Sequence, residues 1–190
     1  MRRVLIRLHP VVLGAALLLA ACGQTAGNGS GKGQGAAAPA APIDACALMP
    51  PEDVRKLTGD VSGSLSSTLD DAVGRDPSQC VYTLGSDLPP KVISLQVRQA
   101  ESAERAAKLH RAAESGLASL AGGTQPVPGL GDGAFWVGGK LDQLHVLAGN
   151  RQLIFTVQID KDPERAVREL AAKALERLKT GAPSAGKPAA

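Results

Sequence analysis

The sequence predicts an α+β fold, in which a single antiparallel sheet of about five strands has helices packed on one face. Two kinds of segment support this prediction. Some segments alternate apolar and polar residues between glycine-containing turns, which is typical of strands in a half-buried sheet. Others carry alanine and leucine at three- and four-residue spacing, which is typical of amphipathic helices. Their order is helix, two strands, helix, three strands, helix, and it favours one layered domain.

Three helices are expected. The first begins at Pro51, because proline is tolerated in the first helical turn, and it ends at Gly59. The second spans 102–120 and is rich in alanine. The third follows residues 162–164, Asp-Pro-Glu, which supply an N-cap, a first-turn proline and a carboxylate near the positive end of the helix dipole. The basic and acidic side chains of this last helix are balanced, which predicts a solvated face.

Five strands are expected, two before the second helix and three after it. The glycine and asparagine at 149–150 indicate a two-residue hairpin turn between the last two strands. The polar stretch 60–79 is predicted to be irregular, because it lacks apolar alternation. The expected strands are 80–84, 93–97, 134–137, 141–148 and 151–159.

The first 22 residues have the pattern of an export signal. Three arginines within the first seven residues precede an apolar run, 11–21, which is too short to span a bilayer. Residues 19–22 read Leu-Ala-Ala-Cys, which resembles the lipobox of bacterial lipoproteins. The resemblance implies cleavage before Cys22 and lipid attachment to its thiol. The alternative is an ordinary secretory signal with an incidental cysteine.

This resemblance implies a lipoprotein anchored to a membrane outside the cytoplasm. Two or three acyl chains on Cys22 would hold it there, because one chain alone gives only marginal binding. Gly23, in place of aspartate, implies the outer membrane if the cell has two membranes. In a cell with one membrane, the protein would sit on the outer face of that membrane.

The remaining chain divides by composition. Residues 1–21 are the signal peptide, and 22–42 are the lipidated cysteine with a Gly/Ala/Pro-rich tether. A single folded domain is expected over 43–179, and a disordered tail over 180–190. The tether and tail are expected to be disordered because such compositions bury too little apolar surface to offset the entropy of ordering.

Charge and aromatic content argue against nucleic acid as a partner. Three of the 21 basic residues leave with the signal peptide, so 18 Lys and Arg face 18 Asp and Glu in the mature chain. A neutral chain has no electrostatic reason to bind phosphate backbones. The whole sequence holds one Trp, one Tyr and two Phe, too few for a base-stacking platform.

Two cysteines remain once Cys22 carries lipid. An exported protein with two such residues usually pairs them, so a disulfide is expected between Cys46 and Cys80. It would join the start of the first helix to the first expected strand. The alternative is a redox-active or metal-binding thiol pair, although no Cys-x-x-Cys spacing is present.

No catalytic or metal constellation stands out, and no cofactor or metal is expected. The two histidines after the signal, His110 and His145, do not form a His-x-x-x-His or His-Glu pair. No Gly-x-Ser-x-Gly elbow occurs. The candidates for hydrolytic chemistry are therefore His145 and Asp132, either of which would need a nucleophile nearby.

The glycine-rich stretch 128–136 is the most distinctive internal feature. It lacks the lysine and the following helix of a phosphate-binding loop. The main interpretation is a tight turn that directs Phe135 or Trp136 into the core. The alternative is a binding lip made of Gly131, Asp132 and a partly exposed Trp136. Because neighbouring strand residues point to opposite faces, one aromatic ring should be core and the other outside.

Short motifs across the folded region resemble a group of small bacterial lipoprotein domains. Residues 44–54 match a start of the form D-x-C-x-L-L-T-x-x-E-V, except that Met49-Pro50 replaces Leu-Thr. Residues 80–82 match its later C-x-Y, and the Gly-Leu-Gly-Asp-Gly-Ala run at 129–134 also fits. The resemblance implies a domain framed by a cysteine pair, and it brings no catalytic residues with it.

The sequence thus favours a non-enzymatic cell-envelope lipoprotein. Its tethered domain would bind an envelope protein or a small apolar ligand, and its membrane contact would be the lipid anchor. The alternative function is an envelope hydrolase, or a factor that acts on cell wall or lipid.

Overall fold

The computed structural model describes residues 43–59, 61–68, 77–86, 88–139 and 142–181. The predicted signal peptide (1–21), the lipidation site at Cys22, the tether (22–42) and the tail from residue 182 onward lie outside the described residues. None of the described helices has the length and apolar character needed to cross a membrane.

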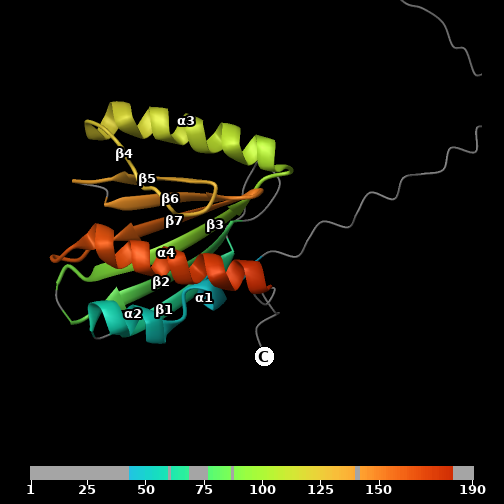
Figure 1. Ribbon diagram of the computed structural model, residues 1–190. Coiled ribbons are helices and arrows are strands. Elements are labelled where there is room, and N and C mark those ends of the chain that lie inside the picture. Colours follow the sequence, from blue (N-terminus) through green and yellow to red (C-terminus); the bar gives the residue numbers. More distant parts are fainter. Residues whose placement is uncertain (1–42, 60, 69–76, 87, 140–141, 182–190) are drawn as a thin grey trace, which may run out of the picture. The chain divides into compact units, whose positions relative to one another are not determined.

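Within the described residues, seven strands form one antiparallel sheet (Figure 1). Their spatial order is β1-β2-β3-β7-β6-β5-β4, so two consecutive meanders join where β3 pairs with β7. The α+β class is confirmed. The strands are β1 (Val61–Thr68), β2 (Ser78–Leu84), β3 (Lys91–Gln99), β4 (Gln125–Pro126), β5 (Gly133–Val137), β6 (Gln143–Ala148) and β7 (Arg151–Val157).

The expected number of about five strands is wrong, because the two edge strands were not foreseen. β1 lies in the stretch 60–79 that was predicted to be irregular, and β4 is only two residues long. Each edge strand pairs with a neighbour on one side only, β1 with β2 and β4 with β5. The residues of β1 are mainly serine, glycine and threonine, so backbone pairing forms the strand without an alternating apolar pattern.

Four helices are described, and three of them match the expected segments. α2 (Pro51–Thr58) has Pro51 in its first turn and Gly59 as its C-cap. α3 (Ala103–Ala121) begins after Ser102, whose hydroxyl accepts a hydrogen bond from the Arg105 N–H. α4 (Pro163–Thr180) follows Asp162, and α1 (Ala45–Leu48) was not foreseen because a single turn carries no periodic signal.

Asp162 occupies the predicted N-cap position of α4, but its side chain does not cap the helix. Its backbone has a φ of 43° and its side chain makes no capping hydrogen bond. The carboxylate instead lies 3.7 Å from Nε of Arg165, an ion pair one helical turn away. The helix therefore begins where the sequence predicted, but the Asp162 side chain forms an ion pair with Arg165 instead of a capping hydrogen bond.

The main core lies on one face of the sheet, beneath α1, α2 and α4. Phe155 sits at its centre, paired with Leu95 of β3 on one side and Leu144 of β6 on the other. All three side chains are fully buried. The helical side of this core comes from the apolar stripe of α4, whose buried residues are Ala166, Val167, Leu170, Ala171, Ala174 and Leu175.

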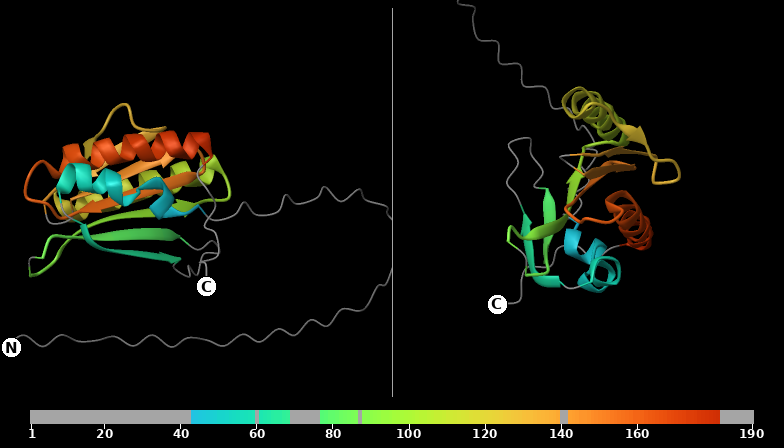
Figure 2. Two further views of the ribbon diagram at one scale, coloured as in Figure 1. Left: turned by 90° about the horizontal axis from the view of Figure 1, so that it is seen from below. Right: turned by 90° about the vertical axis from the view of Figure 1, so that its left-hand side faces the viewer.

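α3 covers the opposite face, so the prediction that the helices pack on one face is wrong. Phe135 and His145 are cross-strand partners on that face, and the ring of His110 from α3 lies 4.9 Å from the ring of Phe135. The amide of Gln152, on the same face, donates to the carbonyl of Ala106 in α3. Figure 2 shows α3 on one side of the curved sheet, with α4, α2 and α1 on the other.

Candidate functional site

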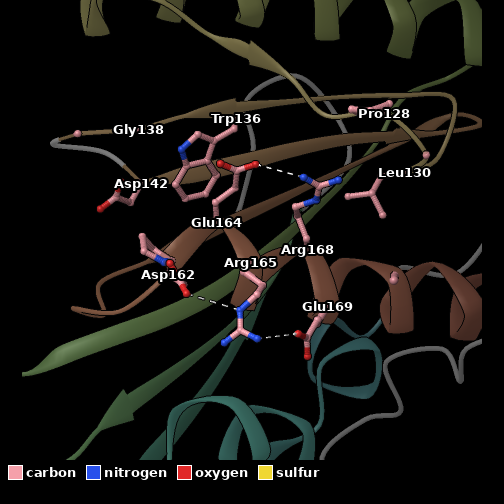
Figure 3. Close-up of a pocket in the computed structure, with 14 residues that line it drawn as sticks. Pro128, Leu130, Trp136, Gly138, Asp142, Asp162, Glu164, Arg165, Arg168 and Glu169 are labelled. Carbon is pink, nitrogen blue, oxygen red and sulfur yellow. Dashed lines mark hydrogen bonds and ion pairs between the residues drawn. The ribbon is translucent and has the colours of Figure 1, made fainter.

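A groove of about 780 Å³ opens on the surface beside α4. We call it the α4 groove. One wall is the exposed flank of α4 and the other is the glycine-rich loop, while the turn after β5 closes one end (Figure 3). Its lining consists of residues 128–130, Trp136, Gly138, Gly139, Asp142, Asp162, Pro163, Glu164, Arg165, Arg168, Glu169 and Ala172.

The helical wall follows from the periodicity of α4. Residues 165, 168, 169 and 172 recur at three- and four-residue spacing, so they share one side of the helix. The apolar stripe on the other side is buried against the sheet and fixes this wall in place. The charged face that the sequence predicted to be merely solvated therefore forms one side of a concave surface.

The floor is apolar and is built on the sheet. Trp136 on β5 is paired with Leu144 of β6 and is only 5% exposed, and its indole lines the groove beside Leu130. A Cβ at Gly138 would lie 3.0 Å from the indole Nε1, so this glycine allows the backbone to pass close to the ring. The alternative prediction, a binding lip with a partly exposed Trp136, is thus wrong, because the side chain is buried. Phe135, on the opposite face, is also buried, because α3 covers that face.

The rim carries an excess of negative charge. Among the lining residues are four carboxylates and two guanidinium groups. Arg168 Nη1 lies 3.3 Å from Glu164 Oε1, and Arg165 lies 3.7 Å from Asp162 and 4.0 Å from Glu169 (Figure 3). Both guanidinium groups are therefore already paired, which leaves the rim with a formal excess of two negative charges.

Gly131 and Asp132 do not line the groove but hold the glycine-rich loop against the β6–β7 hairpin. Gly131 has a φ of 57°, and a Cβ there would stand 2.2 Å from the carbonyl oxygen of Leu147. The Asp132 N–H donates to the same carbonyl (2.8 Å), and its carboxylate accepts from the Gly149 N–H (2.6 Å). These contacts fix the glycine-rich loop to the β6–β7 hairpin. The lip of Gly131, Asp132 and Trp136 is not brought together as one surface, because only Trp136 lines the groove.

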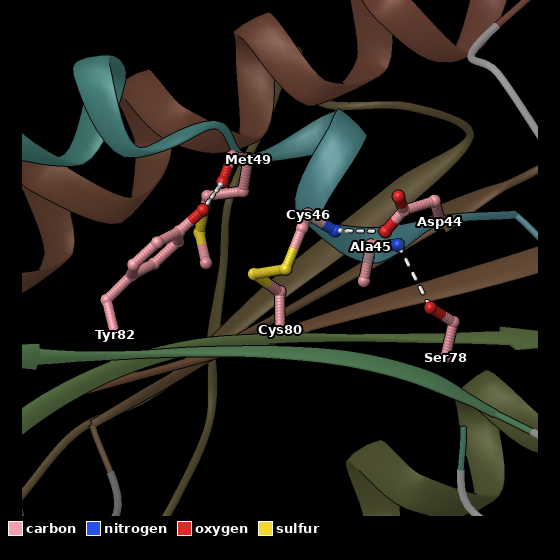
Figure 4. Close-up of a disulfide and its surroundings, with 7 residues drawn as sticks. All are labelled: Asp44, Ala45, Cys46, Met49, Ser78, Cys80 and Tyr82. Atoms are coloured by element: carbon pink, nitrogen blue, oxygen red, sulfur yellow. Dashed lines mark hydrogen bonds between the residues drawn. A yellow bond between two sulfur atoms is a disulfide. The ribbon is translucent and has the colours of Figure 1, made fainter. Parts of the chain in front are cut away.

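The predicted cysteine pair is confirmed. Sγ of Cys46 in α1 lies 2.00 Å from Sγ of Cys80 in β2, a disulfide between residues 34 apart in the sequence (Figure 4). Two further contacts join the same segments. The Tyr82 hydroxyl donates to the Met49 carbonyl (2.8 Å), and the Ala45 N–H donates to the Ser78 hydroxyl (3.0 Å). Together they hold the start of the folded domain on the sheet.

A buried carboxylate links α2 to α4. Asp53 is 3% exposed, and its oxygens accept hydrogen bonds from Lys173 (2.8 Å) and from Arg177. Arg177 also donates to the carbonyl of Leu48, at the end of α1 (3.0 Å). Burial raises the pKa of Asp53, but the two cations lower it more, so its net pKa lies below the ordinary value of 3.8. The cluster is a structural clamp on the core side of the domain.

The two candidate residues for hydrolytic chemistry lie apart from the groove lining. His145 is 7% exposed beneath α3, stacked on Phe135 with ring centroids 4.6 Å apart. Burial, with His110 and Arg98 nearby, lowers its pKa from 6.5 to about 4. The carboxylate of Asp132 is engaged by a backbone N–H, as described above. In the described part of the chain, no three His, Cys, Asp or Glu side chains are grouped so that they could hold a metal ion.

Comparison with known proteins yields no match to this chain among family models, curated proteins or solved structures.

Proposed function

We propose that this chain is a cell-envelope lipoprotein whose tethered domain binds a segment of another envelope protein in the α4 groove. The groove is the observation that carries the binding proposal. Its volume of about 780 Å³ falls within the range of roughly 300–1,000 Å³ typical of ligand sites. Its apolar floor and charged rim stand on a helix and strands that are fixed by the core.

The charge and shape of the groove indicate the chemistry of the partner. An apolar side chain would lie over Trp136 and Leu130, and a neighbouring lysine or arginine would meet the carboxylates of the rim. Apolar burial would supply most of the affinity. The negative rim would favour basic over acidic segments and would speed association at low salt.

The anchor is supported by the sequence alone. Cys22 follows a basic start and a short apolar run, as a lipobox cysteine does. Intact mass spectrometry of the membrane-extracted protein should show a diacyl or triacyl mass on the fragment that begins at Cys22. A Cys22→Ser variant should lack that mass and should leave the membrane fraction. A Cys22→Ser variant that still bears lipid would refute the anchor without bearing on the groove.

Site-specific photo-crosslinking in intact cells tests the groove. Ala172 lines the groove, and its side chain is exposed, so a photoreactive phenylalanine analogue can replace it without disturbing the core. The matched control places the same analogue at Ala112, an exposed alanine of α3 outside the groove. We expect residue 172 to capture a protein segment that contains an apolar residue beside a lysine or arginine. Residue 112 should not capture that segment.

A charge reversal separates specific binding from chance proximity. Glu169→Lys reverses a carboxylate on the rim, and Glu176→Lys makes the same change two turns along α4, outside the lining. Glu169 is 47% exposed and its 4.0 Å pair with Arg165 is a surface pair, so losing it should cost the fold under about 1 kcal/mol. We expect Glu169→Lys to reduce capture and Glu176→Lys to leave it unchanged. Equal capture by both variants, or capture of a small apolar molecule alone, would refute the proposed partner.

A further inference from the structure

The packing of α3 depends on very few side chains. Of its nineteen residues, only Ala106 and His110 are buried, while Leu109 is 41% and Leu120 is 83% exposed. Polar support comes from the Gln152 amide, which donates to the Ala106 carbonyl at 3.4 Å. His110 is therefore the one large side chain that α3 buries against the sheet.

His110 is one end of a three-ring stack. Its ring is tilted on Phe135 of β5 at a centroid distance of 4.9 Å. The other side of the stack is His145 of β6, whose ring is nearly parallel to Phe135 at 4.6 Å. All three side chains are less than 9% exposed. The contact between α3 and the sheet thus contains two buried imidazoles around a phenyl ring.

The surroundings suit neutral imidazoles and not charged ones. Nδ1 of His110 is buried and has no hydrogen-bond partner among the described residues, so a proton there would be a buried, unsatisfied donor. Nε2 of His145 lies 3.2 Å from the amide oxygen of Gln143, and that oxygen is a neutral acceptor. Neither ring has a carboxylate within ion-pair distance in the described structure.

The charged groups that act on the stack are of both signs. Arg98 on β3 and the imidazole of His110 both disfavour a charge on His145. On α3 itself, Arg111 disfavours and Glu114 favours a charge on His110. Asp132, in the loop before β5, directs its carboxylate to a backbone N–H of the β6–β7 turn. The residues of β5 are not titratable, and those of β7 on this face are Gln152, Ile154 and Thr156.

We propose that the His110–Phe135–His145 stack is an acid-sensitive latch, which holds α3 on the sheet and releases it when the imidazoles become protonated. Release would uncover the apolar face of β5, β6 and β7, including Phe135 and Leu147. A face that is closed at neutral pH would then be exposed to solvent under acid conditions. This proposal is independent of the α4 groove, which lies on the other side of the sheet.

The direction of the pH effect follows from linkage. Burial is the main cause that lowers the pKa of His145 to about 4, against an ordinary value of 6.5, and burial also lowers the pKa of His110. In the released state both rings meet water and regain ordinary values. The free energy that favours the closed state is therefore at its full value above pH 6.5, and it decreases as the pH falls from 6.5 toward 4. From His145 alone, the equilibrium constant for release should rise about 20-fold between pH 7 and pH 5.

Hydrogen exchange of the full chain at pH 7 and pH 5, corrected for intrinsic rates and read by mass spectrometry, tests the latch. We expect peptides from α3 to open at least about 20-fold more at pH 5. Peptides from β2 and β3, in the half of the sheet that the disulfide joins to α1, should keep their protection. Unchanged exchange in α3, or an equal loss of protection in all strands, would overturn the proposal.

The control variant is His110→Gln with His145→Gln, which keeps polar side chains that do not titrate in this range. In this variant α3 should exchange at the same corrected rate at both pH values. Histidine resonances of the unmodified chain provide a second measurement that does not depend on the variant folding. His145 should titrate below pH 5, and a midpoint near 6.5 for His145 would overturn the latch.

Discussion

The Cys46–Cys80 disulfide should supply a large part of the stability of this domain. It closes a loop between residues 34 apart, which runs from α1 through α2 and β1 to β2. For a loop of this length, the loss of chain entropy in the unfolded state corresponds to about 4 kcal/mol at 25 °C. A domain of this size is typically stable by only about 5–15 kcal/mol, so reduction should remove a substantial fraction of its stability.

The double variant Cys46→Ala/Cys80→Ala removes the crosslink without leaving buried thiols. In urea unfolding followed by circular dichroism, we expect a loss of about 3–4 kcal/mol and a Tm lower by roughly 10–15 °C. A reducing agent should destabilise the unmodified chain by a similar amount. It should not affect the variant, which therefore serves as the control for other effects of the reducing agent. A loss under about 1 kcal/mol would show that α1 stays on the sheet without the crosslink, and would refute this reasoning.

Four further substitutions should have separable effects in the same unfolding assay. Gly131→Ala places a Cβ 2.2 Å from a backbone carbonyl oxygen and should lower the free energy of unfolding by at least about 2 kcal/mol. In the control Gly129→Ala the new Cβ meets no atom within 4 Å, so the positive φ alone should cost about 1–2 kcal/mol. Equal costs for the two substitutions would contradict the close approach at Gly131. Asp53→Asn should cost about 1–3 kcal/mol at pH 7. Because the pKa of Asp53 is lowered in the fold, the stability that its charge contributes is present above the unfolded pKa near 3.8 and is lost as the pH falls through the lower folded pKa. The stability difference between the unmodified chain and Asp53→Asn should therefore shrink in acid. A difference that stays constant with pH would argue against the ion pairs. Tyr82→Phe removes a buried hydrogen bond to a carbonyl and should cost about 1–1.5 kcal/mol, with no change expected if that carbonyl is instead hydrated.

Local signals predicted the elements that carry them. Pro51 and Gly59 mark the ends of α2, and the two-residue turn at 149–150 joins β6 to β7, as expected. These features depend on residues only a few positions apart. The disulfide could also be predicted, because the first 22 residues have the pattern of an export signal and exported proteins usually pair two remaining cysteines.

The features that were missed depend on contacts between distant segments. β1 is held by pairing with β2, and its serine-rich sequence carries no signal of its own. The second covered face of the sheet was missed because it contains polar residues such as Gln152 and His145, which look solvent-facing in an alternating strand. Only the position of α3 shows that they are buried.

The candidate site also combines a local sequence signal with a contact between distant segments. The sequence singled out Trp136 within the glycine-rich stretch, and this residue does line the α4 groove. It did not identify the opposite wall, because Arg165 and Glu169 are some thirty residues further along the chain and have the spacing of any solvated helix face. Their role depends on where α4 packs against the sheet.

Trp136 offers the most direct test of binding in the α4 groove, because it is the single tryptophan of the chain and lies on the groove floor. A synthetic peptide would be made with the sequence of the segment that crosslinks to residue 172. It would be titrated into the protein while the fluorescence emission of Trp136 is recorded, and calorimetry would measure its affinity independently. We predict a saturable emission change with the calorimetric Kd, weakened by Glu169→Lys and unaffected by Glu176→Lys. Calorimetric binding with unchanged Trp136 emission and equal affinity for both variants would place the partner elsewhere and contradict the proposed site.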